Sequence, residues 1–142
     1  MKKTLITLIF SLFISSSLLA ADQMQFKRNM AHANPVPNYM SIIKMNADTL
    51  GLNSDQKSKV MVWKKKNGPK MAVMVDSIIK GEEEIKSASM AGVSQDKIKA
   101  MADALMDTRK KIIIGKTTCR DYMMSVLSDA QWQQLINIMK AG

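Results

Sequence analysis

The amino-acid sequence predicts an all-α protein of four helices, built on an antiparallel hairpin of two long central helices. Apolar residues recur every three or four positions through two long stretches, about residues 53–90 and 94–126, and this is the helical period. Between these stretches, Ala91-Gly92-Val93 predicts the tight turn of a helical hairpin. No segment shows the alternation of apolar and polar residues that is typical of a strand.

The first 21 residues have the pattern of a signal peptide. Residues 1–3 are a short positive region, residues 5–19 are apolar, and Ala20-Ala21 is a small-residue cleavage site. The apolar stretch is short and contains serines, so a permanent transmembrane helix is not expected. We therefore expect export to the periplasm, cleavage near Ala20-Ala21 and no stable membrane insertion.

Residues 22–37 are expected to form a flexible arm, because they are mostly polar and contain Pro35 and Pro37. A single domain is expected over residues 38–142. Its first helix is predicted over residues 38–50, and Gly51 ends it. The apolar side of this helix is formed by Met40, Ile43, Ala47 and Leu50.

Two capping boxes predict where the second and the fourth helices begin. Their sequences are Leu-Asn-Ser-Asp-Gln and Leu-Ser-Asp-Ala-Gln, starting at Leu52 and Leu127. In such a box the cap side chain, here Asn53 or Ser128, accepts a hydrogen bond from the third helical amide. The Gln three positions later, here Gln56 or Gln131, reaches back to the N–H group of the cap residue. Leu127 and Trp132 also occupy the two positions of a hydrophobic staple.

The second helix is predicted from the first box to about residue 90, with a kink near residues 65–69. Pro69 lacks a backbone donor and clashes with the preceding turn, so a regular helix cannot pass through it undisturbed. The apolar pattern resumes in phase beyond Pro69, which favours a kink over a break.

The third helix, preceded by the cap residue Ser94, has the clearest pattern in the chain. Seven-residue spacing relates two sets of positions, Ile98, Leu105, Ile112, Cys119 and Val126, and Met101, Thr108, Gly115 and Tyr122. In the hairpin, residues whose numbers sum to about 185 should face each other, which places Trp63 beside Tyr122. The fourth helix, residues 129–140, should bury Trp132, Leu135, Ile136 and Met139.

Composition argues against an enzyme. The chain has one His and one Cys, and it has no Gly-rich phosphate loop or converging pair of acidic residues. A zinc site would need more Cys and His ligands than these. No nucleic-acid motif is present, so a nucleic-acid partner is not expected. The formal net charge is +9, or +7 without Lys2 and Lys3, and it favours acidic partners or acidic segments of proteins.

The 14 methionines leave three interpretations open. Met can simply replace Leu as core filler, it can form an adaptable binding surface, or its thioether can bind copper(I). For the binding surface, a basic rim around a Met-lined concavity suggests Met61, Met71, Met74, Lys64, Lys65, Arg109 and Lys116 as client-binding residues. For copper(I), the candidate ligands are Cys119 and Met123, four residues apart, with His32, Met40 or Met45 from the N-terminal segment. Cys119 can equally be a buried core residue.

The two boxes, read as L-x-x-x-Q, resemble the L-T-x-x-Q motifs of the Spy/CpxP family of periplasmic helical stress proteins. Asn53 and Ser128 stand where the family motif has Thr, and the resemblance covers about residues 40–139. It implies a four-helix, hairpin-based cradle that dimerises through antiparallel packing of long helices. The activities that it implies are ATP-independent chaperoning, envelope-stress signalling or metal-linked sensing.

We therefore predict a periplasmic, ATP-independent chaperone or envelope-stress binding protein. It would capture unfolded or non-native proteins on a Met-rich, basic, concave face and would require no cofactor. The alternative is a copper(I)-binding or metal-responsive accessory protein that uses Cys119. A homodimer is expected in either case, because the heptad series of the third helix is more apolar surface than a thin hairpin can bury.

Overall fold

The structure is a computed structural model that describes residues 35–141, and these residues form four α-helices and no strand. The helices are α2 (Tyr39–Met45), α3 (Ser54–Met90), α4 (Gln95–Val126) and α5 (Asp129–Ala141). The prediction of an all-α chain with two long central helices is confirmed. The predicted signal peptide, most of the predicted arm and His32 lie outside the described residues. Among the described helices, none combines the length and the apolar character that crossing a bilayer requires.

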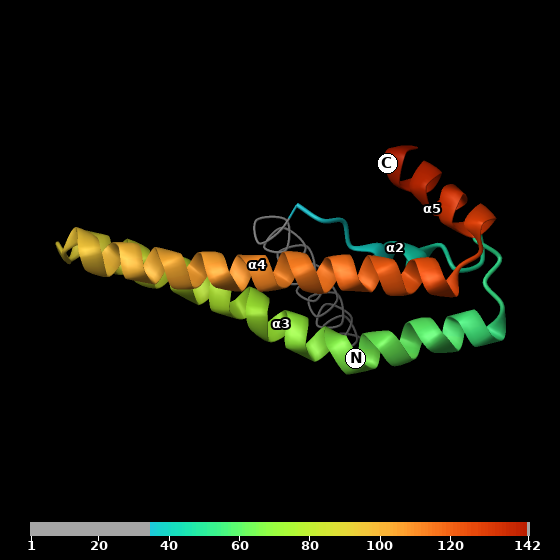
Figure 1. The fold of residues 1–142 in the computed structure, drawn as a ribbon, viewed down its shortest axis with the longest axis horizontal. Coiled ribbons are helices and arrows are strands. Elements are labelled where there is room, and N and C mark those ends of the chain that lie inside the picture. The colour runs from blue at the N-terminus through green and yellow to red at the C-terminus, as the bar shows by residue number, and fades with distance from the viewer. Residues whose placement is uncertain (1–34, 142) are drawn as a thin grey trace, which may run out of the picture. The chain divides into compact units, whose positions relative to one another are not determined.

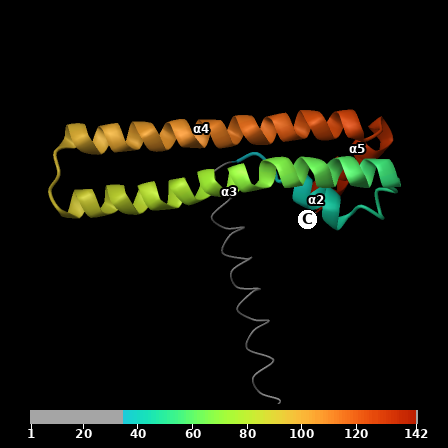
Figure 2. The ribbon, with the colours of Figure 1, turned by 90° about the horizontal axis from the view of Figure 1, so that it is seen from below.

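Helices α3 and α4 run antiparallel and side by side (Figure 2). Gly92 ends α3 in the left-handed region, at a φ of 69°. The N–H group of Val93 donates to the carbonyl of Ala88 at 3.0 Å, and that of Gly92 donates to Ser89 at 3.1 Å. This pair of bonds is a Schellman motif, which satisfies the last carbonyls of the helix. Helix α4 then begins after Ser94, whose side chain makes no capping bond.

The hairpin has the predicted register. The rings of Trp63 and Tyr122 stack with centroids 4.2 Å apart and an interplanar angle of 17°. Further along, a Cβ atom at Gly115 would lie 3.3 Å from Met71 Cε, so α4 presents a glycine where Met71 approaches. The heptad positions of α4 therefore pack against α3 of the same chain. They do not form the free surface from which a dimer was inferred.

Helix α3 continues through Pro69 without a break. Figure 1 shows that α3 changes direction along its N-terminal half, which is the half that contains Pro69. A kink is the expected response to a proline, since one backbone hydrogen bond is lost and the ring displaces the preceding turn. The prediction of a kink in place of a break is confirmed.

Helix α2 is shorter than the predicted helix over residues 38–50. It ends at Asn46, whose side-chain amide donates to the carbonyl of Ile42 at 2.8 Å, as does the backbone N–H group of Asn46 at 3.1 Å. This side-chain bond competes with continuation of the helix. Residues 46–51 form turns that close with a second Schellman motif, in which Gly51 has a φ of 62°. Gly51 thus ends this segment as predicted, although the helix proper stops earlier.

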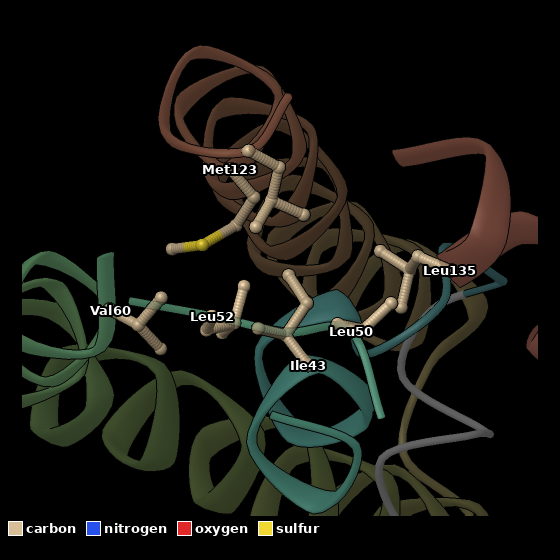
Figure 3. Close-up of a cluster of buried hydrophobic side chains, with 7 residues drawn as sticks. Ile43, Leu50, Leu52, Val60, Met123 and Leu135 are labelled. Atoms are coloured by element: carbon tan, nitrogen blue, oxygen red, sulfur yellow. The ribbon is translucent and has the colours of Figure 1, made fainter. Parts of the chain in front are cut away.

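The core lies at the open end of the hairpin, where all four helices contribute (Figure 3). Helix α2 packs against α3, α4 and α5. The rings of Tyr39 and Trp132 join α2 to α5 with centroids 5.4 Å apart. Complete burial of such apolar side chains contributes about 1.5–3 kcal/mol each to stability. The buried members of this cluster are Ile43, Leu50, Leu52, Val60, Met123, Leu127 and Leu135.

Both predicted capping boxes form. Asn53 Oδ1 accepts from the N–H group of Gln56 at 2.8 Å, and Gln56 Oε1 accepts from the N–H group of Asn53 at 3.1 Å. The corresponding bonds between Ser128 and Gln131 measure 3.3 and 2.9 Å. In the staple position, Leu127 is buried and Trp132 packs against the same core cluster.

The two boxes are joined to each other through their glutamines. Gln56 Nε2 donates to Gln131 Oε1 at 2.8 Å, and Gln131 Nε2 donates to Gln56 Oε1 at 3.2 Å. Each amide also reaches the chain just before the other box. Gln56 Nε2 donates to the carbonyl of Val126 at 3.0 Å, and Gln131 Nε2 donates to that of Leu50 at 3.1 Å. We call this pair, Gln56 and Gln131, the glutamine clasp.

The clasp predicts non-additive mutations. Gln56→Ala and Gln131→Ala should each lower the free energy of unfolding by about 1–2 kcal/mol, because each removes one box and leaves partners of the other unpaired. The double variant should lose less than the sum, with a coupling energy of about 0.5–3 kcal/mol. Urea unfolding of the four proteins measures this coupling. Gln133→Ala is the matched control, since Gln133 is exposed on α5. Strictly additive losses would contradict the clasp.

Candidate functional site

The residues that were predicted to bind clients differ in how far they are exposed. Met61, Lys64 and Lys65 are exposed in the N-terminal half of α3. Met71, Met74 and Arg109 are only partly exposed, and Met71 faces Gly115 inside the hairpin. Arg109 forms an ion pair with Glu82 across the two helices. Three of these six residues are therefore well exposed, and three are only partly exposed.

Lys116 is buried, with 8% of its surface exposed. Its Nζ atom donates to the carbonyl of Val36 at 2.8 Å. Burial lowers the pKa of the Lys116 ammonium group, because a charged amine loses hydration inside the protein. Lys116 thus ties the segment before α2 to α4 and does not present its charge to solvent.

A stripe of exposed apolar side chains runs along the hairpin instead. Each member directly follows a residue that packs between the two helices, as Ile113 follows buried Ile112 and Met124 follows buried Met123. Antiparallel helices are related by a two-fold axis perpendicular to the plane of the hairpin, so these positions point to the same side on both helices. We call this set the apolar stripe. Its members are between 36% and 57% exposed and are Met61, Ile79, Met106, Ile113 and Met124.

Charge is segregated along the hairpin. Residues 56–75 of α3 contain six lysines and no acidic residue. Residues 76–107, around the turn, contain seven acidic and four basic residues. Lys44 of α2 lies beside Lys64 of α3, and this neighbour lowers the pKa of Lys44. The open end of the hairpin is therefore positive and the turn end negative, an arrangement that attracts anionic partners to the open end.

Three of the candidate copper ligands within the described residues belong to the core, whereas the fourth, Met45, is 70% exposed. Cys119 and Met40 pack, partly buried, against the same cluster that contains buried Met123. Burial raises the pKa of the Cys119 thiol, an effect that the Trp63 side chain and the Lys116 charge partly offset. Only the thiolate binds metals well, and burial disfavours it. Across residues 35–141, no three His, Cys, Asp or Glu side chains gather into a group that could hold a metal ion. These observations favour a packing role for Cys119.

The glutamine clasp is the feature of this region that sequence reasoning missed. The sequence does contain a signal for it, because both glutamines stand at the same position of the two boxes. A capping box uses only the side-chain oxygen of its glutamine, so the amide nitrogen must find an acceptor elsewhere. Here each nitrogen finds the other glutamine and a carbonyl at the end of a neighbouring segment.

Cys119→Ser should lower the free energy of unfolding by about 1–3 kcal/mol, because the hydroxyl group would be buried without a full set of partners. Titration with copper(I) should give the same affinity for the variant and the parent protein. Tight binding of one copper(I) per chain that is lost in Cys119→Ser and in Met123→Ala would reverse this assignment.

The pKa of Cys119 gives a second test. A thiol whose pKa is raised by folding stabilises the protein fully below its unfolded pKa, about 8.5, and loses this contribution as the pH rises through the folded pKa. The parent protein should therefore lose stability relative to Cys119→Ala as the pH is raised above about 8.5. Urea unfolding at several pH values measures the difference. A constant difference would contradict the raised pKa of the Cys119 thiol.

Comparison of this chain with family models, curated proteins and solved structures finds no match. Its functional assignment therefore depends on its own residues: the apolar stripe, the distribution of charge and the two motifs.

Proposed function

We propose that this chain is a periplasmic, ATP-independent chaperone or envelope-stress binding protein of the Spy/CpxP kind, which captures non-native proteins reversibly. The observation that carries the proposal is the apolar stripe. Five large apolar side chains are exposed along one side of the described hairpin, three of them methionines. Exposed apolar side chains that gather on one side of a protein are typical of a site that binds other molecules.

The chemistry of the stripe suits clients of varied sequence. A Met side chain has three rotatable bonds and a polarizable sulfur atom, so it can adapt to differently shaped apolar groups. Binding by such contacts needs no nucleotide and no cofactor. The lysines of residues 56–75 supply the second element, since they attract acidic segments from a distance before apolar contact is made.

The stripe also replaces the heptad series as the surface for a homodimer. Because the heptad positions are occupied by α3, a second copy would have to pack on exposed side chains. The homodimer stays a prediction, and light scattering at tens of micromolar tests it. A monomer at that concentration would contradict it. If the parent protein is a dimer and the Met106→Ser/Ile113→Ser variant is a monomer, the dimer interface lies on the apolar stripe.

The purified protein should suppress aggregation of a chemically denatured model enzyme without ATP. Met106→Ser/Ile113→Ser should weaken suppression, because it removes two exposed apolar groups of the stripe. Val62→Ser/Val73→Ser is the matched control, since it removes two exposed apolar side chains from another side of α3. Light scattering by the client as a function of chaperone concentration measures the effect.

The dependence on salt distinguishes the electrostatic attraction of clients from their apolar binding to the stripe. Added salt should slow capture, because charges on the protein surface are screened beyond about 8–10 Å at physiological ionic strength. The amount of client held at equilibrium should change less, since apolar contact holds it. Absence of suppression at several-fold molar excess would contradict the chaperone proposal.

A further inference from the structure

One face of α3 has no role in the fold and lies apart from the apolar stripe, although its lysines belong to the segment that attracts acidic clients. It lies about half a turn of helix away from the buried side of α3, which contains Val60, Val75 and Ile78. All its members are exposed, and Val62 and Val73 are 62% and 65% exposed. We call it the outer face of α3; it consists of Val62, Lys65, Lys66, Pro69, Lys70 and Val73.

The charge of the outer face is uncompensated. Within the described residues, no ion pair involves its lysines, whereas Lys57 and Lys59 pair with Asp48 and Asp55. The acid-free segment, residues 56–75, extends on both sides of it. Figure 1 shows that α3 changes direction in this half of the helix, and the six residues of the outer face are exposed there.

We propose that the outer face of α3 binds peripherally to the surface of a membrane that contains anionic phospholipids. Lysines on an exposed helix attract anionic headgroups near the membrane surface. Val62 and Val73, 11 residues apart on the same face, would enter the interfacial region between the headgroups. The binding is reversible and differs from insertion, since α3 is not apolar enough to cross a membrane.

The composition of the face favours lipid over other anionic partners. Its cations are all lysines, which act as point charges, whereas arginine provides the bidentate geometry that specific nucleic-acid contacts use. It has no aromatic residue on which a base could stack. Val62 and Val73 stand on the same face as the lysines, so apolar contact and headgroup attraction would act together at a membrane interface.

The test is cosedimentation with phosphatidylcholine vesicles, prepared with and without phosphatidylglycerol. The full chain is used as cells produce it, and mass spectrometry confirms that all variants share one N-terminus. Binding should require phosphatidylglycerol and weaken with salt. Lys65→Glu/Lys66→Glu should lower the partition coefficient by at least about tenfold. The matched control, Lys80→Glu/Lys97→Glu, changes the net charge equally but in the acidic turn region, and it should retain most binding.

The apolar contribution has its own control. Val62→Ser/Val73→Ser should weaken vesicle binding several-fold, and Met106→Ser/Ile113→Ser should not. Equal losses for the two charge-reversed variants would show an effect of net charge alone and would overturn the proposal. Displacement from vesicles by polyglutamate, combined with no effect of Val62→Ser/Val73→Ser, would instead assign the face to acidic protein segments. The aggregation assay is expected to be unchanged by Val62→Ser/Val73→Ser, so this inference and the chaperone proposal can fail separately.

Discussion

The glutamine clasp is the interaction on which the rest of the structure depends. A hairpin of two long helices is closed by its turn at one end only, and the other end must be held together by side chains. At that end the clasp connects the start of α3 with the start of α5, and it caps the carbonyls of Leu50 and Val126. Both amide groups are oriented by the backbone, since each oxygen faces an N–H group of its own box. The clasp therefore positions four chain segments around one apolar core.

Because the core is concentrated at the clasped end, the long arms of the hairpin are free to serve other purposes. Most of their side chains neither build the core nor close the hairpin. The apolar stripe lies beside the contact between α3 and α4, whereas the outer face of α3 lies opposite that contact. The turn end is acidic and the clasped end is rich in lysine. The charge of the hairpin is therefore asymmetric, and it attracts anionic molecules to the clasped end.

Much of the fold could be predicted because its signals are local. Gly51 and Gly92 end segments through their own backbone conformation, and each box is formed by residues three positions apart. The stack of Trp63 on Tyr122 followed from counting residues away from a short turn. The clasp joins two residues that are 75 positions apart in the sequence, and a local pattern cannot predict such a contact. The burial of Lys116 likewise depends on Val36, in a segment where periodicity gives no information. For the candidate site, the sequence indicated which residue types are present, but only the packing decides which methionines reach the surface.

The seven-residue spacing of α4 has a consequence for how such chains can vary in length. Beyond α2, the hairpin consists of α3 and α4 alone, which meet in a repeating pattern. If seven residues were removed from each helix near the turn, the remaining heptad positions of α4 would still face their partners on α3. The core at the clasped end would be unchanged. A change in one helix only would shift every pair, including Trp63 and Tyr122. The hairpin can therefore be shortened or lengthened by seven residues in each helix at once without any change to the core at the clasped end.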